Sequence, residues 1–295
     1  MNPSDPLQPL GICQSDLAPN DTRSQDFDWT GLGVHFVQST TDANFRLGYD
    51  ALWQEFGHKN EMETRDVIAR RLAWRPEEPT ASGYALRYEM IVVRHGDTLA
   101  AVRDHTAIVD LNRPDVPAIV HLSHLLIAEA WRGNGLAGWM RALPIYTARE
   151  CMKRAGQSTR PINLIAEMEP AVANEPGVFG RLKAYERAGF KKIDPSRVNY
   201  LQPDFRPADE IDRTGGPTPL PLSLVLRRIG REDETNIPAT KVRAIVESLY
   251  AMYAASFGDK HMTPLFAQLN TYPTGDEPIA LVPPTLVPSP LEGEG

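Results

Sequence analysis

The chain has 295 residues, of which 42% are hydrophobic and 23% charged, as in ordinary globular domains. Its formal net charge of −7 argues against a nucleic-acid-binding protein, because such proteins usually carry a basic face. No apolar run approaches the ~20 residues that a membrane-spanning helix needs, and the polar amino terminus lacks the pattern of a secretory signal. We therefore expect a cytoplasmic protein with neither nucleic acid nor membrane as a partner.

The two cysteines, Cys13 and Cys151, lie far apart in the chain. They form neither a disulfide framework nor a C-x-x-C spacing, so no metal site is predicted. This cysteine usage fits a reducing compartment.

Composition divides the chain into three parts. Residues 1–26 are rich in Pro, Asp, Ser and Asn and lack periodicity, so we expect a disordered leader. Residues 27–258 alternate between strand and helix patterns and predict one domain, closed by an amphipathic helix over 238–258. Residues 259–295 end in a Pro/Gly/Glu-rich stretch and are expected to be a mostly flexible tail.

The first half of the domain begins with a short strand, 34–37, and a helix that Thr41 or Asp42 caps. A second helix is predicted over 61–73. The spacing of apolar residues then changes from that of a helix to that of strands. It predicts a hairpin of two strands, 84–93 and 98–109, joined by the turn His95-Gly96-Asp97. A further strand is predicted over 118–128.

In the second half of the domain, predicted helices and strands alternate. A helix kinked at Pro144 follows the 118–128 strand. The remaining predicted elements are a buried strand at 162–166, a helix at 178–188 ended by Gly189, a strand at 190–193, a long loop at 203–221 and a strand at 222–229.

Two motifs carry the chemistry. Arg132-Gly133-Asn134-Gly135-Leu136-Ala137 joins the 118–128 strand to the next helix. The backbone N–H groups at such a helix start point outward and favour phosphate. About fifty residues later, Tyr185-Glu186-Arg187-Ala188-Gly189-Phe190 places a tyrosine at a helix end, before a glycine stop and a new strand.

The order of elements over roughly 33–229, together with these motifs, resembles the GNAT acyltransferase superfamily. Arg132-x-x-Gly135-x-Ala137 matches the family's [QR]-x-x-G-x-[GA] pattern, and Tyr185-x-x-x-Gly189-Phe190 matches its second site. The resemblance implies a mixed α/β fold with a twisted, mostly antiparallel sheet, splayed at the parallel pair 118–128 and 162–168. Helices would cover both faces, with an extra C-terminal helix.

The resemblance also implies acetyl-CoA, or another acyl-CoA, as co-substrate. The expected binding residues for the pyrophosphate are Arg132, Gly133, Asn134, Gly135, Leu136 and Ala137. The strand from Leu125 to Ile127 resembles the one that pairs with the pantetheine arm.

Tyr185 resembles the family's tyrosine beside the coenzyme sulfur, where a phenol can protonate the departing thiolate. His121 is the expected general base for the amine, since some family members carry a histidine at a similar place. Strand alternation places His121 and Ser123 on one face with Leu125, and His124 on the other. Glu167 and Glu169 are fallback bases.

The predicted activity is transfer of an acetyl or other short acyl group to a small-molecule or peptide amine. Asn174 precedes Tyr185 by eleven residues rather than about seven, which departs from the family. A non-catalytic acyl-CoA-binding regulatory module is therefore an alternative. A nucleotide-phosphate site is a third, but the P-loop lysine is missing. The acceptor and the oligomeric state stay open, and a homodimer is possible.

Overall fold

The protein is described by a computed structural model that covers residues 6–59, 61–170 and 176–287. Its strands are β1 (Leu32–Phe36), β2 (Tyr84–His95), β3 (Thr98–Asp110), β4 (Ala118–Ile127), β5 (Ile162–Met168), β6 (Lys191–Ile193), β7 (Tyr200–Gln202), β8 (Leu220–Arg228), β9 (Asn236–Pro238) and β10 (Pro278–Val282). Its α-helices are α1 (Thr22–Gln25), α2 (Ala43–Phe56), α3 (Arg65–Leu72), α4 (Leu136–Ala142), α5 (Pro144–Arg154), α6 (Pro176–Arg187), α7 (Ala208–Arg213), α8 (Ala239–Ala254) and α9 (Asp259–Gln268). Short 3₁₀ turns lie at Gln8–Leu10, Gln14–Asp16, Gly57–Lys59, Glu129–Trp131 and Leu269–Thr271. None of the described helices is long and apolar enough to cross a membrane.

One sheet organises these elements in the order β1-β2-β3-β4-β5-β8-β6-β10-β9, with β7 also paired to β8. Among the described strands only β4 and β5 pair in parallel, and the remaining pairs are antiparallel. The predicted fold class, a mostly antiparallel sheet with one parallel pair and helices on both faces, is confirmed.

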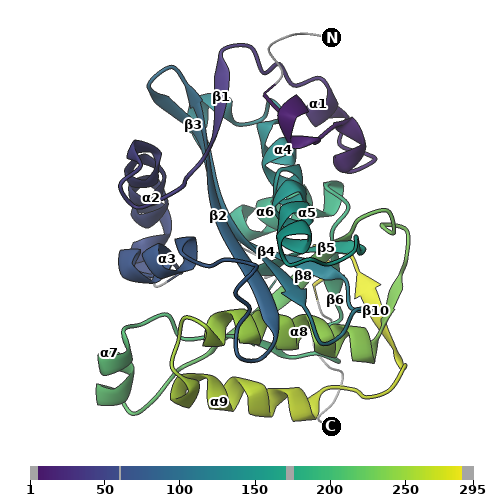
Figure 1. Cartoon of the computed structure of the whole chain (residues 1–295). Helices are drawn as coiled ribbons and strands as arrows, with labels where there is room; N and C mark the ends of the chain where they lie inside the picture. The colour runs from purple at the N-terminus through teal and green to yellow at the C-terminus, as the bar shows by residue number, and fades with distance from the viewer. Residues whose placement is uncertain (1–5, 60, 171–175, 288–295) are drawn as a thin grey trace.

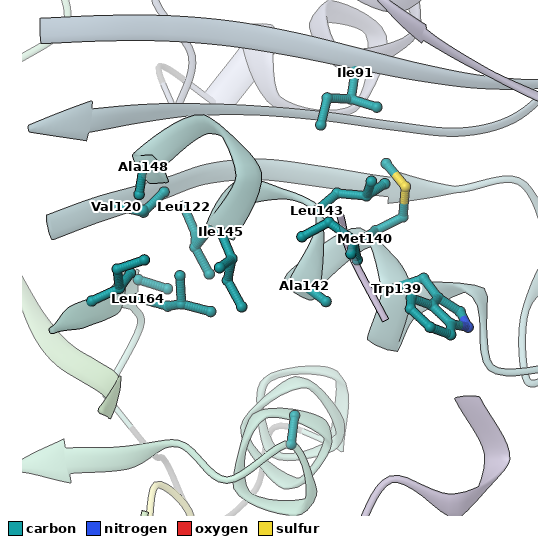
Figure 2. Packing of buried hydrophobic residues seen from close by; sticks show 14 of the residues in the cluster. Ile91, Val120, Leu122, Trp139, Met140, Ala142, Leu143, Ile145, Ala148 and Leu164 are labelled. Carbon is teal, nitrogen blue, oxygen red and sulfur yellow. The ribbon is translucent and has the colours of Figure 1, made fainter. Parts of the chain in front are cut away.

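The two faces of the sheet bury different helices (Figure 1). One face packs against α4, α5 and α6, and Figure 2 shows Val120 and Leu122 of β4 directed toward Ile145 of α5. The other face packs against α2 and α3 at one end and against α8 and α9 at the other. The extra C-terminal helix, α8, is thus part of the core, with Val242, Ile245 and Leu249 buried.

The parallel pair is short. The register runs from Ala118 opposite Ile162 to His121 opposite Ile165 and goes no further, although β4 continues to Ile127 and β5 to Met168. The two strands therefore separate toward their carboxyl ends. This separation is the splay that the sequence resemblance implied.

A β-bulge interrupts β4 at the same place. His105 of β3 pairs with Leu122 and Arg103 pairs with Leu125, so Ser123 and His124 together oppose Asp104. An extra residue on one strand shifts every later side chain to the opposite face. The expected strict alternation is therefore wrong beyond Ser123. His124 lies on the His121 face, and Leu125 packs into the core on the α4 and α5 side.

Pro144 divides the helix after the glycine loop into α4 and α5 instead of merely kinking it. The proline occupies the first turn of α5, where its missing N–H costs no hydrogen bond. The predicted loop at 203–221 contains α7 and the beginning of β8.

Residues 6–26 differ from the disordered leader that composition indicated. Leu7, Ile12 and Leu17 are buried in the core on the α4 and α5 face. The Arg227 guanidinium donates to the carbonyls of Asp16, at 2.9 Å, and Leu17, at 2.8 Å. Because Arg227 lies some 210 positions away in the chain, no local sequence pattern predicts these hydrogen bonds. Residues 1–5 lie outside the described part of the chain.

The expected tail is also structured where it is described. Helix α9 packs on α8, and β10 pairs with both β6 and β9. The C-terminal segment thus completes the sheet edge. Residues 288–295 lie outside the described residues.

A buried ion pair holds the bulge. His124 donates its backbone N–H and its Nδ1–H to Asp104 Oδ1, both at 2.9 Å, and its Nε2 lies 2.8 Å from the carbonyl oxygen of Glu61. Since both ring nitrogens face acceptors, the ring must carry two protons. Burial by itself lowers the pKa of His124, but Asp104 outweighs it and raises the pKa from 6.5 to about 9. The same pair, with a hydrogen bond from Tyr88, holds the pKa of Asp104 below its usual range despite burial.

The raised pKa of His124 predicts a stability profile. Its stabilising contribution is complete below pH 6.5 and is lost as the pH rises through about 9. We expect the free energy of unfolding to fall by roughly 3 kcal/mol between about pH 6 and about pH 10 in urea titrations. His124→Gln should remove this decline, whereas the exposed control His58→Gln should keep it. Parallel profiles for wild type and His124→Gln would contradict the assignment.

The packing of the leader on α4 predicts a second effect. A methyl group at Gly138 would overlap the side chains of Ser24 and Asp21, whereas one at Gly180 of α6 would meet nothing within 4 Å. Gly138→Ala should destabilise the fold by about 1–3 kcal/mol, as overpacking does. Gly180→Ala, at an exposed helical position, should be neutral or stabilising by up to about 1 kcal/mol. Thermal unfolding of both variants tests this, and equal effects would show that the leader does not pack as described.

Candidate functional site

A cavity of about 720 Å³ opens where β4 and β5 separate. Leu125, Leu126 and Ile127 of β4 line one side, and Met168 of β5 lines the other. The volume is in the range of small-molecule sites. The cavity extends from the flank of the glycine loop to the buried end of β7 and α8, along the residues Arg132, Ala137, Arg141, Glu169, Gly180, Arg181, Ala184, Tyr185, Ser123, His121, Glu167, Gln202 and Tyr253.

The glycine loop presents only part of its length to this cavity. Arg132 and Ala137 line it, and the Arg132 Nε donates to the carbonyl of Ile127 at 3.0 Å. Gly133 and Asn134 are exposed, whereas the Leu136 side chain is fully buried and its N–H donates to Asn134 Oδ1 at 3.2 Å. The Leu136 amide is thus already paired within the loop.

Gly135 is required for a reason that the motif did not reveal. Its φ of 105° suits glycine, and a Cβ there would lie 2.5 Å from the backbone oxygen of Arg23. Ser24 Oγ donates to the Gly135 carbonyl at 2.7 Å, and Trp139 Nε1 donates to the Ser24 carbonyl at 2.7 Å. On this side, the loop accommodates the leader.

Tyr185 projects from α6 into the cavity. Its ring contacts Phe190 edge to face, with centroids 4.9 Å apart, and the Arg141 guanidinium lies 5.6 Å from its centroid. The hydroxyl makes no hydrogen bond to any residue that the structure describes. Gly189, with a φ of 77°, ends the helix and returns the chain to β6.

Arg141 is a cavity residue that the sequence analysis missed. It is 8% exposed, and its Nε has no hydrogen-bond partner among the described residues. Its nearest carboxylate oxygen, Asp21 Oδ2, is 4.0 Å away. Burial lowers the pKa of Arg141, but a guanidinium stays charged. A largely unpaired cation beside Tyr185 favours an anionic or hydrogen-bond-accepting ligand.

His121 lies at the inner end of the cavity and is 2% exposed. Its Nε2 is 3.0 Å from Glu167 Oε2, and its Nδ1 is 3.2 Å from Ser123 Oγ. The two strand residues thus share a face, as expected for the portion of β4 before the bulge. Glu167, a fallback base in the sequence analysis, is the hydrogen-bond partner of the His121 ring.

Four donors surround the Glu167 carboxylate. Besides His121, Tyr253 Oη donates at 2.8 Å and Gln202 Nε2 at 2.7 Å to Oε2, and Tyr200 Oη donates to Oε1. Burial by itself raises the pKa of Glu167, but His121 and the other donors outweigh it and hold the pKa below its ordinary value. Burial and the nearby carboxylate raise the pKa values of Tyr200 and Tyr253 well above 10. Both phenols therefore stay neutral donors.

A second carboxylate lies nearby in the cavity wall. Glu63 is 2% exposed, and its Oε1 is 2.5 Å from the buried Arg71 guanidinium. Arg71 also lies over the Tyr253 ring, 5.7 Å from its centroid. Glu169, at the other end, forms an ion pair with Arg181. Asn174 lies outside the described residues.

The sequence offered no signal for several of these residues. Gln202, Tyr200 and Tyr253 come from a short strand and a C-terminal helix that lie 33 to 86 residues from Glu167. Their only common feature is a contact with one buried carboxylate. Such a contact becomes visible only when the strands are placed.

Comparison with family models finds no match, and comparison with curated proteins finds none either. Among solved structures, an acetyltransferase from Streptococcus agalactiae is 10% identical, with a TM-score of 0.36 over 68% of this chain and 99% of that chain. An acyl-CoA N-acyltransferase from Pseudomonas aeruginosa is 15% identical, with a TM-score of 0.34 over 66% and 99%. FeeM, an N-acyl amino acid synthase from uncultured soil microbes, is 9% identical, with a TM-score of 0.36 over 75% and 96%.

These TM-scores lie below 0.5 and indicate only a distant likeness. The β4–β5 parallel pair, its separation, the glycine loop leading into α4 and the tyrosine at the end of α6 are the features that the sequence resemblance implied. The chain thus has the sheet topology that the resemblance to the GNAT superfamily implied.

Proposed function

We propose that the protein transfers an acetyl or other short acyl group from an acyl-CoA to an amine. The observation that carries this proposal is the continuity of one cavity. It connects the flank of the glycine loop, the free hydroxyl of Tyr185 and the His121–Glu167 pair. Acyl transfer to an amine needs a place for the thioester, an acid for the leaving sulfur and a base for the amine.

The residues present fit an acyl-CoA as co-substrate. Among the described residues, β4 does not pair with β5 beyond His121. The backbone N–H and C=O groups on that edge of β4 are therefore available to the pantetheine arm of the coenzyme. Arg132, Arg141 and Arg181 line the cavity and suit the phosphates and the thioester oxygen. Acyl-CoA supplies the activated carbonyl, and the protein supplies orientation and proton transfer.

Two residues that line the same cavity supply the two proton transfers. Tyr185 is the acid for the departing thiolate, since a neutral phenol with a free hydroxyl can donate its proton to sulfur. His121 is the base, because Glu167 fixes its ring and stabilises the imidazolium that forms. The acceptor, a small-molecule or peptide amine, would enter between Glu63 and Ser123, where both line the wall.

Replacing Tyr185 by Phe tests the acid. We expect kcat for CoA release from acetyl-CoA, measured with an acceptor found in a broad amine and peptide screen, to fall by about 10²-fold. The dissociation constant for CoA should stay within about twofold, because the phenyl ring and its packing on Phe190 remain. Tyr146→Phe, whose ring packs on Phe36 outside the cavity, is the matched control. Unchanged turnover in Tyr185→Phe would remove Tyr185 from the mechanism.

Replacing Ala137 by a larger residue tests whether CoA binds beside the glycine loop. Ala137→Leu fills the cavity beside the glycine loop and should weaken CoA binding by about tenfold or more, equal to roughly 1.4 kcal/mol, in calorimetry. Ala208→Leu, at the exposed first turn of α7, should leave it unchanged. CoA binding without CoA release for any acceptor would instead favour a regulatory acyl-CoA-binding module. Binding of ATP but not CoA would overturn both functions.

A further inference from the structure

Both ring nitrogens of His121 are engaged within the protein. Although the ring borders the cavity, Nε2 faces Glu167 and Nδ1 faces Ser123. An acceptor amine therefore cannot reach a free nitrogen of this base. The proton must pass through one of the two partners.

The directions of the hydrogen bonds indicate which of the two partners can pass a proton to His121. Glu167 receives donors from Tyr200, Gln202 and Tyr253 and is a carboxylate, so it only accepts. In the neutral ring that a base requires, the Nε2 of His121 therefore carries the proton, and Nδ1 is the acceptor. Ser123 Oγ then donates its proton to Nδ1, across 3.2 Å. The lone pairs of Oγ remain available to the cavity, which Ser123 lines and where it is only half-buried.

We infer that Ser123 is a catalytic residue that relays the proton of the acceptor amine to His121. This inference rests on the proposed acyl transfer. The ammonium of the acceptor gives one proton to Ser123 Oγ while the Ser123 proton moves to His121 Nδ1, which leaves the neutral amine beside a Glu167–imidazolium pair. The amine nitrogen then forms a bond to the thioester carbonyl carbon, and the carbon–sulfur bond breaks.

The remaining protons balance. Tyr185 gives its phenolic proton to the thiolate and regains one from the nitrogen that becomes the amide. His121 returns its extra proton through Ser123 to solvent. The net products are amide, free CoA and one proton, and no oxidant, reductant or metal is required.

The bulge in β4 gives Ser123 its position. Because Ser123 and His124 together oppose Asp104, His124 can be clamped by Asp104 while Ser123 stays beside His121 on the same face. His124 is a donor at both nitrogens and cannot accept a proton, so it does not compete as base. The titratable and charged groups that face this pair from the surrounding elements are Glu167 of β5, Tyr200 of β7, Tyr253 of α8, His124 of β4, and Glu63 and Arg71 beside Tyr253.

Ser123→Ala in the full-length protein tests the relay. With an alkyl amine acceptor whose pKa is about 10, kcat/KM near neutral pH should fall by about 10²-fold. The deficit should shrink as the pH approaches the pKa of the acceptor, and with a weakly basic amine it should be small at every pH. A purely structural role would lower the rate equally for both acceptors.

Three further measurements make the test decisive. Ser123→Thr should recover most of the activity, because it keeps the hydroxyl. Ser248→Ala, which removes a buried hydroxyl that donates to the Ala244 carbonyl, should behave as wild type. CoA affinity and thermal unfolding should be the same in all three variants, so that a loss of activity reports chemistry rather than folding.

The outcomes separate the two claims. If wild type transfers the acyl group and Ser123→Ala matches it within about twofold at every pH, Ser123 is not a relay although the proposed function stands. Mass spectrometry that finds an acyl group on Ser123 during turnover would also overturn the relay, because the serine would then be a nucleophile. A wild type that binds CoA but acylates no amine would overturn both.

Discussion

The parallel pairing of β4 with β5, and its early end, is the constraint on which the site depends. Parallel strands need a crossover, and here the glycine loop, α4 and α5 make it, so the loop lies at the carboxyl end of β4. Hydrogen bonds join the strands only as far as His121 and Ile165. Beyond that point the strands separate and a cavity replaces the ladder. The position of every cavity residue on β4, β5 and α6 follows from this separation.

Two buried carboxylates then hold the two histidines of β4 by hydrogen bonds. Asp104 and the Glu61 carbonyl offer only acceptors to His124, which must therefore be a cation. Glu167 accepts hydrogen bonds from three other donors, and its Oε2 lies beside the Nε2 of His121, whose Nδ1 lies beside the Ser123 hydroxyl. Three residues apart, one ring is held as a buried cation and the other borders the cavity. The β-bulge at Ser123 and His124 allows both to lie on one face.

The glycine loop shows how one motif serves two demands. On one side Arg132 and Ala137 border the cavity, as the motif indicates for ligand binding. On the other side the backbone of Arg23 and Ser24 lies against Gly135, where any side chain would collide with it. Glycine at this position is required by the leader and by its positive φ, whatever binds opposite. Motif matching alone cannot separate these causes, because both favour the same residue.

The sequence by itself determined the order of elements, the parallel pair, the glycine loop and the tyrosine at the end of α6, because period, turn chemistry and caps are local properties. It also placed His121 and Ser123 on one face, since two residues along a regular strand share a side. Only the tertiary structure decided the bulge that reverses His124 and Leu125, the ordering of residues 6–26 and 259–287, and the donors around Glu167. Each of these depends on contacts between segments far apart in the chain: Asp104 with His124, Arg227 with the leader, Tyr253 with Glu167. Burial of a charge or an apolar side chain by a distant element produces no periodic pattern in the sequence, so the fold could be predicted while the partners of Glu167 and His124 could not.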